Sequence, residues 1–173
     1  MGVYMKKVYN YLLVVLLALS LSSNVLASNA ELSMSVENQS MIQFSNGDRF
    51  VGNVKNGIAN GSGTYYFVNG DVLTGEFTNG LINGGAVFTI ISMGLNYEGQ
   101  FVNGVASGYG ILTFVNKNEK YEGQFSNNTM EGKGKYYFSD GSYFEGSFAK
   151  GVPIGRGKYY NSSGVIIREG SFD

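Results

Sequence analysis

Apolar and polar residues alternate along most of the chain in short segments bounded by glycine and asparagine. In residues 50–54 the pattern has a period of two, so the apolar side chains at both ends of this segment share one face of a strand. The pair Asn56-Gly57 then predicts a two-residue hairpin turn, because both residue types tolerate a positive φ. A second apolar segment, residues 64–67, completes a β-hairpin before the next turn.

The hairpin pattern recurs along the chain at a nearly constant spacing. A glycine occupies the centre of each opening strand, and successive copies are 23 or 24 residues apart. These glycines are Gly52, Gly75, Gly99, Gly123, Gly146 and Gly170. A fixed period of this length is typical of repeat arrays. Full units begin near residues 50, 73, 97, 121 and 144, and partial units at both ends extend the array over residues 42–173.

Aromatic residues flank the central glycine in most opening strands. The aromatic positions that define the repeat are Tyr97, Phe101, Tyr121, Phe125, Phe144 and Phe148. A glycine in a strand interior leaves the backbone bare, so we expect a ring from a neighbouring strand to lie across it. The repetition predicts continuous aromatic ridges on one face. Since a single hairpin is marginal in water, the array must be stabilised by the stacking of neighbouring units.

The units that begin at Tyr97, Tyr121 and Phe144 contain aromatic-Glu-Gly-x-Phe, a two-residue turn, Gly-x-Gly and a short aromatic strand. This pattern resembles the MORN (membrane occupation and recognition nexus) repeat, and the resemblance covers residues 42–173. It implies an all-β fold, an elongated single-layer antiparallel array of β-hairpins in a meander. Three segments depart from the pattern, and we expect altered local turn geometry there: Ala86, residues 91–94 and residues 116–119.

The N-terminal residues have a different character. Two lysines at positions 6 and 7 precede an apolar segment, residues 12–21, and a small-residue pattern ends at Ala27. This layout predicts a helical, cleaved signal peptide over residues 1–27, and therefore a secreted or periplasmic protein. Cleavage after Ala30 is a second option. An uncleaved membrane anchor is the alternative, although the apolar segment is shorter than the ~20 residues that span a bilayer.

Residues 28–41 are polar and show no clear period, so we interpret them as a flexible linker between the leader and the array. The net charge is −1, and cleavage would shift it to −3 because two of the twelve basic residues, Lys6 and Lys7, would leave with the leader. A chain of this charge has no electrostatic attraction for nucleic acid.

The composition argues against an enzyme. The chain lacks histidine and cysteine, and no motif frames a serine nucleophile, so we expect no catalytic residue, no metal, no cofactor and no small-molecule substrate. The Gly-x-Gly segments precede strands and not helices, so we interpret them as structural turns and not as phosphate loops. A glutamate recurs at one position of the repeat, and successive copies should lie about 10 Å apart along the array. This spacing favours a solvated face over a paired-carboxylate catalytic site. These glutamates are Glu98, Glu122, Glu145 and Glu169.

The outward side of the second strand of each unit is the candidate interaction surface. Its residues are Tyr66, Thr89, Thr113, Tyr137 and Tyr160. A single-layer sheet does not cover both of its faces, and exposed aromatic patches commonly mark binding surfaces. The alternative is that sheet twist and long neighbouring side chains cover these rings.

These observations predict a non-enzymatic protein-interaction or scaffold module that binds a protein partner or another copy of itself. The alternative function is peripheral binding of acidic phospholipids, which the family name suggests. The support for lipid binding is weak, because acidic residues are interleaved with the C-terminal lysines and arginines. Carbohydrate binding on the tyrosines stays open.

Overall fold

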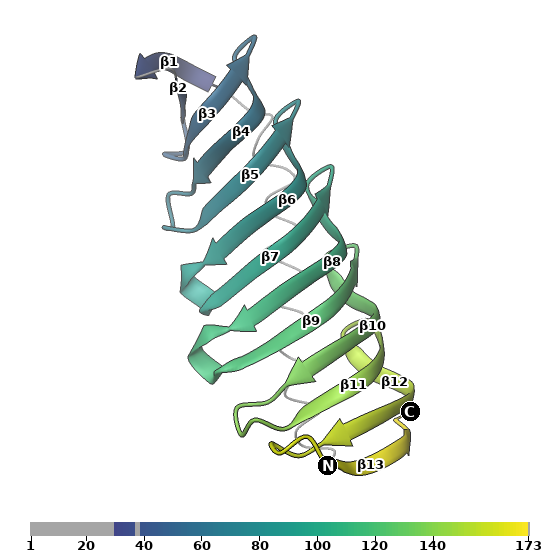
Figure 1. Ribbon diagram of the computed structural model, residues 1–173. Helices are drawn as coiled ribbons and strands as arrows, with labels where there is room; N and C mark the ends of the chain where they lie inside the picture. Colours follow the sequence, from purple (N-terminus) through teal and green to yellow (C-terminus); the bar gives the residue numbers. More distant parts are fainter. Residues whose placement is uncertain (1–29, 37–38, 173) are drawn as a thin grey trace.

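The computed structural model describes residues 30–36 and 39–172, which form one antiparallel sheet of thirteen strands in chain order (Figure 1). The strands are β1 (Ala30–Val36), β2 (Gln39–Phe44), β3 (Arg49–Lys55), β4 (Ile58–Tyr66), β5 (Val72–Thr78), β6 (Leu81–Ile90), β7 (Leu95–Val102), β8 (Val105–Phe114), β9 (Glu119–Ser126), β10 (Thr129–Tyr137), β11 (Tyr143–Ala149), β12 (Val152–Tyr160) and β13 (Ile166–Ser171). The predicted all-β hairpin array is confirmed. The predicted helical signal segment lies outside the described residues.

Each unit is a hairpin closed by a two-residue turn in which both residues have positive φ. In the β3–β4 turn φ is 53° at Asn56 and 76° at Gly57, the combination that the twist of a hairpin favours. The second turn residue also reaches the preceding unit, as when the Gly104 N–H donates to the Ile82 carbonyl over 2.8 Å. The turns therefore connect consecutive hairpins as well as closing them.

The two glycines of each Gly-x-Gly segment have different roles, which the unit of β7 and β8 illustrates. Gly108 has a φ of 101° and lies at a β-bulge, where the pairing register shifts between Gly99 and Phe101. Gly110 lies under the ring of Tyr97, and a Cβ on Gly110 would stand 2.6 Å from the tyrosine oxygen. The first glycine thus supplies a backbone conformation, and the second supplies space.

The expectation that a neighbouring strand covers the bare glycines is correct for one glycine of each pair only. The Tyr97 ring crosses to Gly110 on the adjacent strand, but it also covers Gly99 two residues along its own strand. The prediction is therefore wrong for the central glycine of the opening strand. The reason is the pleat: residues two apart share a face, and Gly99 pairs with Gly110, so one ring covers both.

The second unit shows the same packing with the sizes exchanged. Leu73 replaces the aromatic residue, and Ala86 replaces the ring-covered glycine. The smaller leucine side chain leaves space for the Ala86 methyl group. A Cβ added to Gly75 would stand 2.6 Å from this methyl group, so Gly75 must stay without a side chain. The departure at Ala86 is thus compensated within its own hairpin.

The core is a continuous series of aromatic contacts along one face. The Tyr97 ring meets Phe101 edge-on at 5.2 Å within its own strand, and Phe125 at 4.9 Å in the next unit. The same pair of contacts recurs at Tyr121, and edge-to-face geometry is the favourable one for aromatic pairs. Tyr97 and Tyr121 are fully buried. The predicted aromatic ridges are confirmed.

Two turns that depart from the repeat pattern form single turns of 3₁₀ helix. They are η1 (Ile91–Met93) and η2 (Val115–Lys117), and each ends in a left-handed residue, Gly94 and Asn118 respectively. The η1 turn is bound to the preceding turn, because the Ile91 N–H donates to the Asp71 carboxylate over 2.8 Å. The altered geometry expected for these segments is therefore confirmed.

The linker predicted over residues 28–41 differs from the structure. Residues 30–36 form β1, and β2 begins at Gln39 and pairs with β3 through contacts such as Ile42 opposite Phe50. Backbone pairing with the first complete hairpin organises this segment. The sequence carried a signal for β1, because Leu32, Met34 and Val36 alternate with polar residues.

Candidate interaction surface

The face opposite the aromatic core, here called the polar face, carries the five predicted interaction residues in a single cross-strand row. This tyrosine row consists of Arg49, Tyr66, Val72, Thr89, Asn96, Thr113, Lys120, Tyr137, Tyr143, Tyr160 and Ile166. The structure therefore places the predicted residues on one face. All five are partly buried and not fully exposed, because their neighbours in the row cover them.

At the C-terminal end of the row three tyrosines pack together. Tyr143 and Tyr160 stack at 4.4 Å with their planes 11° apart, and Tyr137 lies 5.6 Å from Tyr143. Tyr143 joins the two predicted tyrosines but was missed, because only second strands were considered and Tyr143 begins an opening strand. Tyr66 lies at the other end of the row, under the Arg49 guanidinium at 4.3 Å. The predicted set is thus one row but not one patch.

A second row, the charge row, contains the recurrent glutamates. It runs Val51, Thr64, Thr74, Val87, Glu98, Ile111, Glu122, Lys135, Glu145, Lys158 and Glu169. Its first four residues are uncharged, and the charges alternate in sign from Glu122 to Glu169.

The glutamates of the C-terminal half form ion pairs with lysines on the same face. Lys135 lies 3.2 Å from Glu145, and Lys158 lies 3.8 Å from Glu169. The hydrogen bond that the Lys135 ammonium donates to Glu145 raises the pKa of Lys135. Each such pair is solvent-exposed and contributes about 0.2–1 kcal/mol. Three of the four glutamates predicted to form a solvated face, Glu122, Glu145 and Glu169, therefore pair with lysines there.

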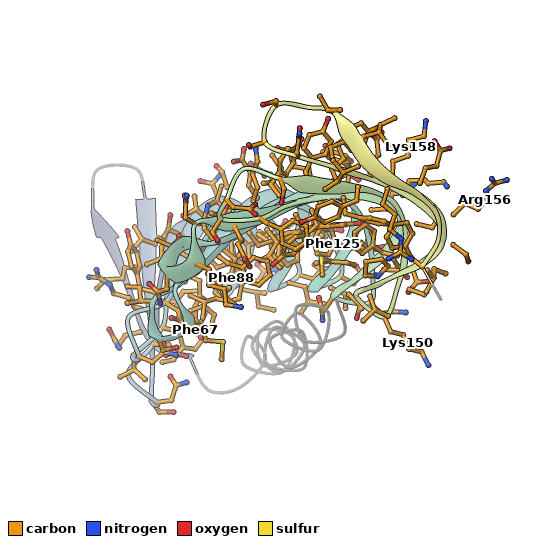
Figure 2. All side chains as sticks on the ribbon, turned by 90° about the horizontal axis from the view of Figure 1, so that it is seen from below. Phe67, Phe88, Phe125, Lys150, Arg156 and Lys158 are labelled. Atoms are coloured by element: carbon orange, nitrogen blue, oxygen red, sulfur yellow. The ribbon has the colours of Figure 1, made fainter. Side chains whose placement is uncertain are left out.

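A third row contains the middle residue of each Gly-x-Gly segment, together with Gly85 at the equivalent position of the second unit, where Ala86 replaces the second glycine. These residues are Ser62, Gly85, Tyr109, Lys133 and Arg156, and all five are exposed. Instead of forming the turns expected from the sequence, the Gly-x-Gly segments lie inside β4, β6, β8, β10 and β12. We call this the glycine-flanked row. In Figure 2 Arg156 and Lys158 point outward from the curved sheet, whereas Phe88 and Phe125 lie inside the curve.

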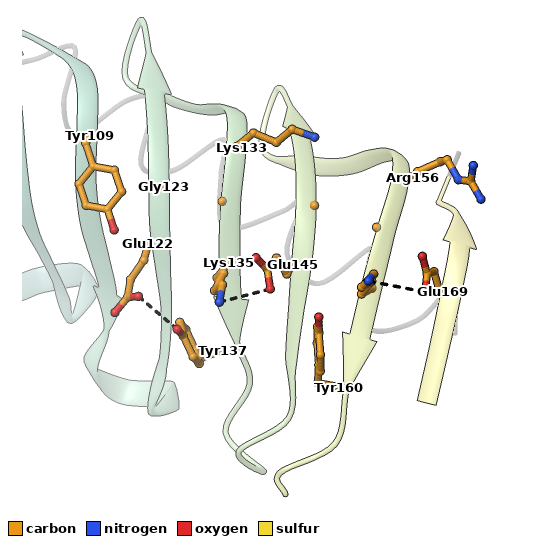
Figure 3. Close-up of a pocket in the computed structure, with 14 residues that line it drawn as sticks. Tyr109, Glu122, Gly123, Lys133, Lys135, Tyr137, Glu145, Arg156, Tyr160 and Glu169 are labelled. Atoms are coloured by element: carbon orange, nitrogen blue, oxygen red, sulfur yellow. Dashed lines mark hydrogen bonds and ion pairs between the residues drawn. The ribbon is translucent and has the colours of Figure 1, made fainter. Parts of the chain in front are cut away.

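Three open pockets follow one another along the polar face, with volumes of about 360, 560 and 710 Å³ from the N-terminal end. The first two share Thr74 and Gly85, and the second and third share Tyr109. Figure 3 shows the largest of these three pockets, with Tyr109, Lys133 and Arg156 along one side and Tyr137 and Tyr160 along the other. The ion pairs of the charge row cross its floor.

The chemistry of this face is that of binding. It presents tyrosine rings, lysine and arginine donors and carboxylate acceptors, with the Tyr137 hydroxyl donating to Glu122 over 3.2 Å. Within the described ranges no group of three or more histidines, cysteines or acidic residues is arranged to hold a metal ion. No helix in the same part of the chain is long and apolar enough to cross a bilayer.

A sequence model of the MORN repeat matches five consecutive segments of the chain. The segments are residues 50–72, 74–89, 97–119, 121–143 and 144–165. Together they cover more than half of the 173 residues. The chain belongs to the MORN repeat family. The units of this MORN array coincide with the hairpins described above, which confirms the resemblance drawn from the sequence.

The solved structures that are similar to this chain include two domains at low sequence identity. One is the SAS-4 (dCPAP) TCP domain of Drosophila melanogaster, in complex with a proline-rich motif of Ana2 (dSTIL), at 11% identity and a TM-score of 0.49. The match covers 82% of the present chain and 90% of the chain of the SAS-4 domain. The other is the TCP10 domain of Danio rerio CPAP, at 13% identity and a TM-score of 0.30, covering 78% of this chain and 73% of its own. A comparison with curated proteins finds no match.

Proposed function

We propose that this MORN array is a non-enzymatic, secreted or periplasmic protein-interaction module that binds its partner on the polar face. The observation that carries this proposal is the pocket of about 710 Å³, in which tyrosines and cations converge on one side of a rigid sheet. Tyrosine and arginine are enriched at protein interfaces because they combine apolar area with hydrogen-bonding groups.

The distribution of side chains supports the polar face over the aromatic one. The aromatic side chains of the core are buried against one another, so they have little free surface for a partner to contact. On the polar face Tyr109 keeps 58% of its surface exposed, and Tyr137 and Tyr160, which line the same pocket, are half-buried. A partner that covered this pocket would therefore bury apolar ring surface that the array itself leaves in water.

Charge favours a protein partner over an anionic membrane. Lys120, Lys135 and Lys158 each lie within 4 Å of a glutamate, so much of the positive charge on this face is neutralised locally. Binding to acidic lipids depends on a net excess of basic residues near the surface. Binding to phosphatidylserine vesicles is accordingly the rival outcome in the test below.

The test compares two matched triple variants in quantitative capture experiments with proteins secreted by the source cells. The first variant, Tyr137→Ala/Tyr143→Ala/Tyr160→Ala, removes the tyrosine cluster. The second, Val68→Ala/Ile91→Ala/Val115→Ala, removes exposed apolar side chains from turns that line no pocket described above. Circular dichroism checks that both variants keep their sheet. The proposal requires a captured set that the second variant retains and the first loses.

Light scattering over a range of concentrations tests whether the partner is a second copy. A dimer that the tyrosine variant converts to a monomer would identify self-association through this face. Equal capture by both variants, or vesicle binding without protein binding, would overturn the proposed function.

A further inference from the structure

The glycine-flanked row has a property that the other rows of the polar face lack. Four of its residues stand between a bulge glycine and a ring-covered glycine, neither of which has a Cβ; in the second unit Ala86 replaces the ring-covered glycine beside Gly85. In the unit of β9 and β10, Gly132 has a φ of 85° and Gly134 lies under the Tyr121 ring, with Lys133 between them. The middle residue can therefore vary in size and charge without disturbing the core. This position is suited to determining specificity, one residue per repeat.

Two members of the row differ from the other cations of the polar face. Lys120, Lys135 and Lys158 each have a glutamate partner. Among the described residues, neither Lys133 nor Arg156 forms an ion pair; Lys133 donates to the Ser147 hydroxyl over 2.9 Å, and Arg156 lies opposite Ser171. The cross-strand neighbours of Lys133 and Arg156 are serines, whereas those of Lys135 and Lys158 in the charge row are glutamates. The positive charges of Lys133 and Arg156 are thus available to a ligand at the edge of the largest pocket.

The spacing of the row matches an extended polypeptide. Tyr109, Lys133 and Arg156 lie on β8, β10 and β12, and alternate strands of a sheet are about 10 Å apart. An extended chain in the polyproline II conformation has three residues per turn and advances about 3.1 Å per residue, so every third side chain lies on the same side, about 9 Å further along. A segment lying across the strands would place every third side chain at successive members of the row.

We propose that Tyr109, Lys133 and Arg156 recognise an extended partner segment with two acidic residues three positions apart and an apolar residue three positions from one of them. The acids pair with Lys133 and Arg156, and the apolar side chain packs on the exposed Tyr109 ring. The inference rests on the proposed interaction function and supplies its ligand class. Charge complementarity of this kind sets partner choice more than raw affinity.

The probe is a fluorescein-labelled decapeptide with valine at its first and last positions, glutamate at its fourth and seventh, and serine elsewhere. Its pattern reads the same in both directions, so it serves either orientation of the bound segment. A control peptide of the same composition has its two glutamates adjacent. Fluorescence anisotropy with the purified chain, expressed with its own N-terminal segment, should show at least about threefold tighter binding of the patterned peptide at low salt.

Lys133→Gln and Arg156→Gln should each weaken binding of the patterned peptide about threefold, and Lys55→Gln should leave it unchanged. Lys55 is a matched control because it is an exposed cation at the tip end of β3, in the first hairpin. The Lys133→Glu/Arg156→Glu variant should lose the glutamate peptide and bind its lysine counterpart instead. A merely structural role for these residues would not produce this exchange of preference.

Equal affinity for the patterned and control peptides would overturn the inference. So would binding of phosphatidylserine vesicles through Lys133 and Arg156 without binding of the peptide. The same charge variants, used in the capture experiment above, separate the two levels of the argument. If the tyrosine variant loses the captured partner while the charge variants retain it, the interaction function stands and the acidic ligand class is wrong.

Discussion

Substituting alanine at a ring-covered glycine tests whether space under the ring stabilises the array. In Gly110→Ala the new Cβ would stand 2.6 Å from the Tyr97 oxygen and 2.7 Å from the ring carbon Cε2. Both distances are far below van der Waals contact, so the ring must move. Tyr97 is fully buried, and it packs edge-on against Phe101 and Phe125 while its hydroxyl donates to the Gln100 carbonyl over 3.1 Å.

The magnitude follows from these contacts. Overpacking of a well-packed core costs about 1–3 kcal/mol, and each aromatic pair contributes roughly 0.5–1.5 kcal/mol beyond burial. We therefore expect Gly110→Ala to lower the free energy of unfolding by roughly 2–4 kcal/mol. Gly85→Ala is the matched control, because Gly85 is exposed and a Cβ there meets nothing within 4 Å. This control should be neutral or should stabilise by up to about 1 kcal/mol.

Urea unfolding followed by circular dichroism measures both variants, with the slope of the transition checking that the array unfolds cooperatively. The second unit suggests a compensating change, because Leu73 and Ala86 occupy there the positions of Tyr97 and Gly110. In a Tyr97→Leu background Gly110→Ala should cost at least about 1 kcal/mol less than it does alone. Strictly additive effects, or equal stabilities of Gly110→Ala and Gly85→Ala, would refute the role assigned to the ring.

Three further predictions concern the turns and the buried polar groups. Gly57→Ala meets no atom within 4 Å but requires a φ of 76°, so it should cost about 1–2 kcal/mol in urea unfolding through strain alone; stability equal to wild type would contradict this. Asp71→Ala removes the acceptor of the Ile91 N–H and should cost about 1–3 kcal/mol, whereas Glu76→Ala, which removes an exposed carboxylate, should stay within about 0.5 kcal/mol. Burial raises the pKa of Tyr97 and of Tyr121 well above the ordinary value of 10.0, and the unfolded chain releases these protons first. Stability is therefore fully present below about pH 10 and should fall as the pH rises further, with tyrosinate absorbance appearing together with unfolding; unchanged stability up to pH 11 would exclude this linkage.

The fold could be predicted from the sequence because its information is local. Period-two alternation, paired turn residues and the 23- to 24-residue repeat predicted hairpins, their order and the aromatic face. Turn chemistry depends on the φ that two neighbouring residues adopt, and stacking of identical units follows from the repeat. For the same reason Tyr97, Tyr121 and Phe144 were correctly assigned to the core.

The candidate site could be predicted only in part. The sequence placed Tyr137 and Tyr160 on the face opposite the core, but it did not identify Tyr143 between them or the pairing of Lys135 with Glu145. Sequence reasoning also interpreted the Gly-x-Gly segments as turns, whereas three of their middle residues, Tyr109, Lys133 and Arg156, line the pocket of about 710 Å³. These relations join residues on different strands.

The sequence by itself determined that the protein is a linear array of β-hairpins with one aromatic face, because each unit carries its own alternation and turns. Only the tertiary structure decided which side chains meet across that array. The physical reason is the bulge in these hairpins, which adds two residues to the second strand and shifts its pairing, so cross-strand neighbours do not follow from sequence spacing. The row that joins Tyr109, Lys133 and Arg156 exists because that shift recurs in every unit.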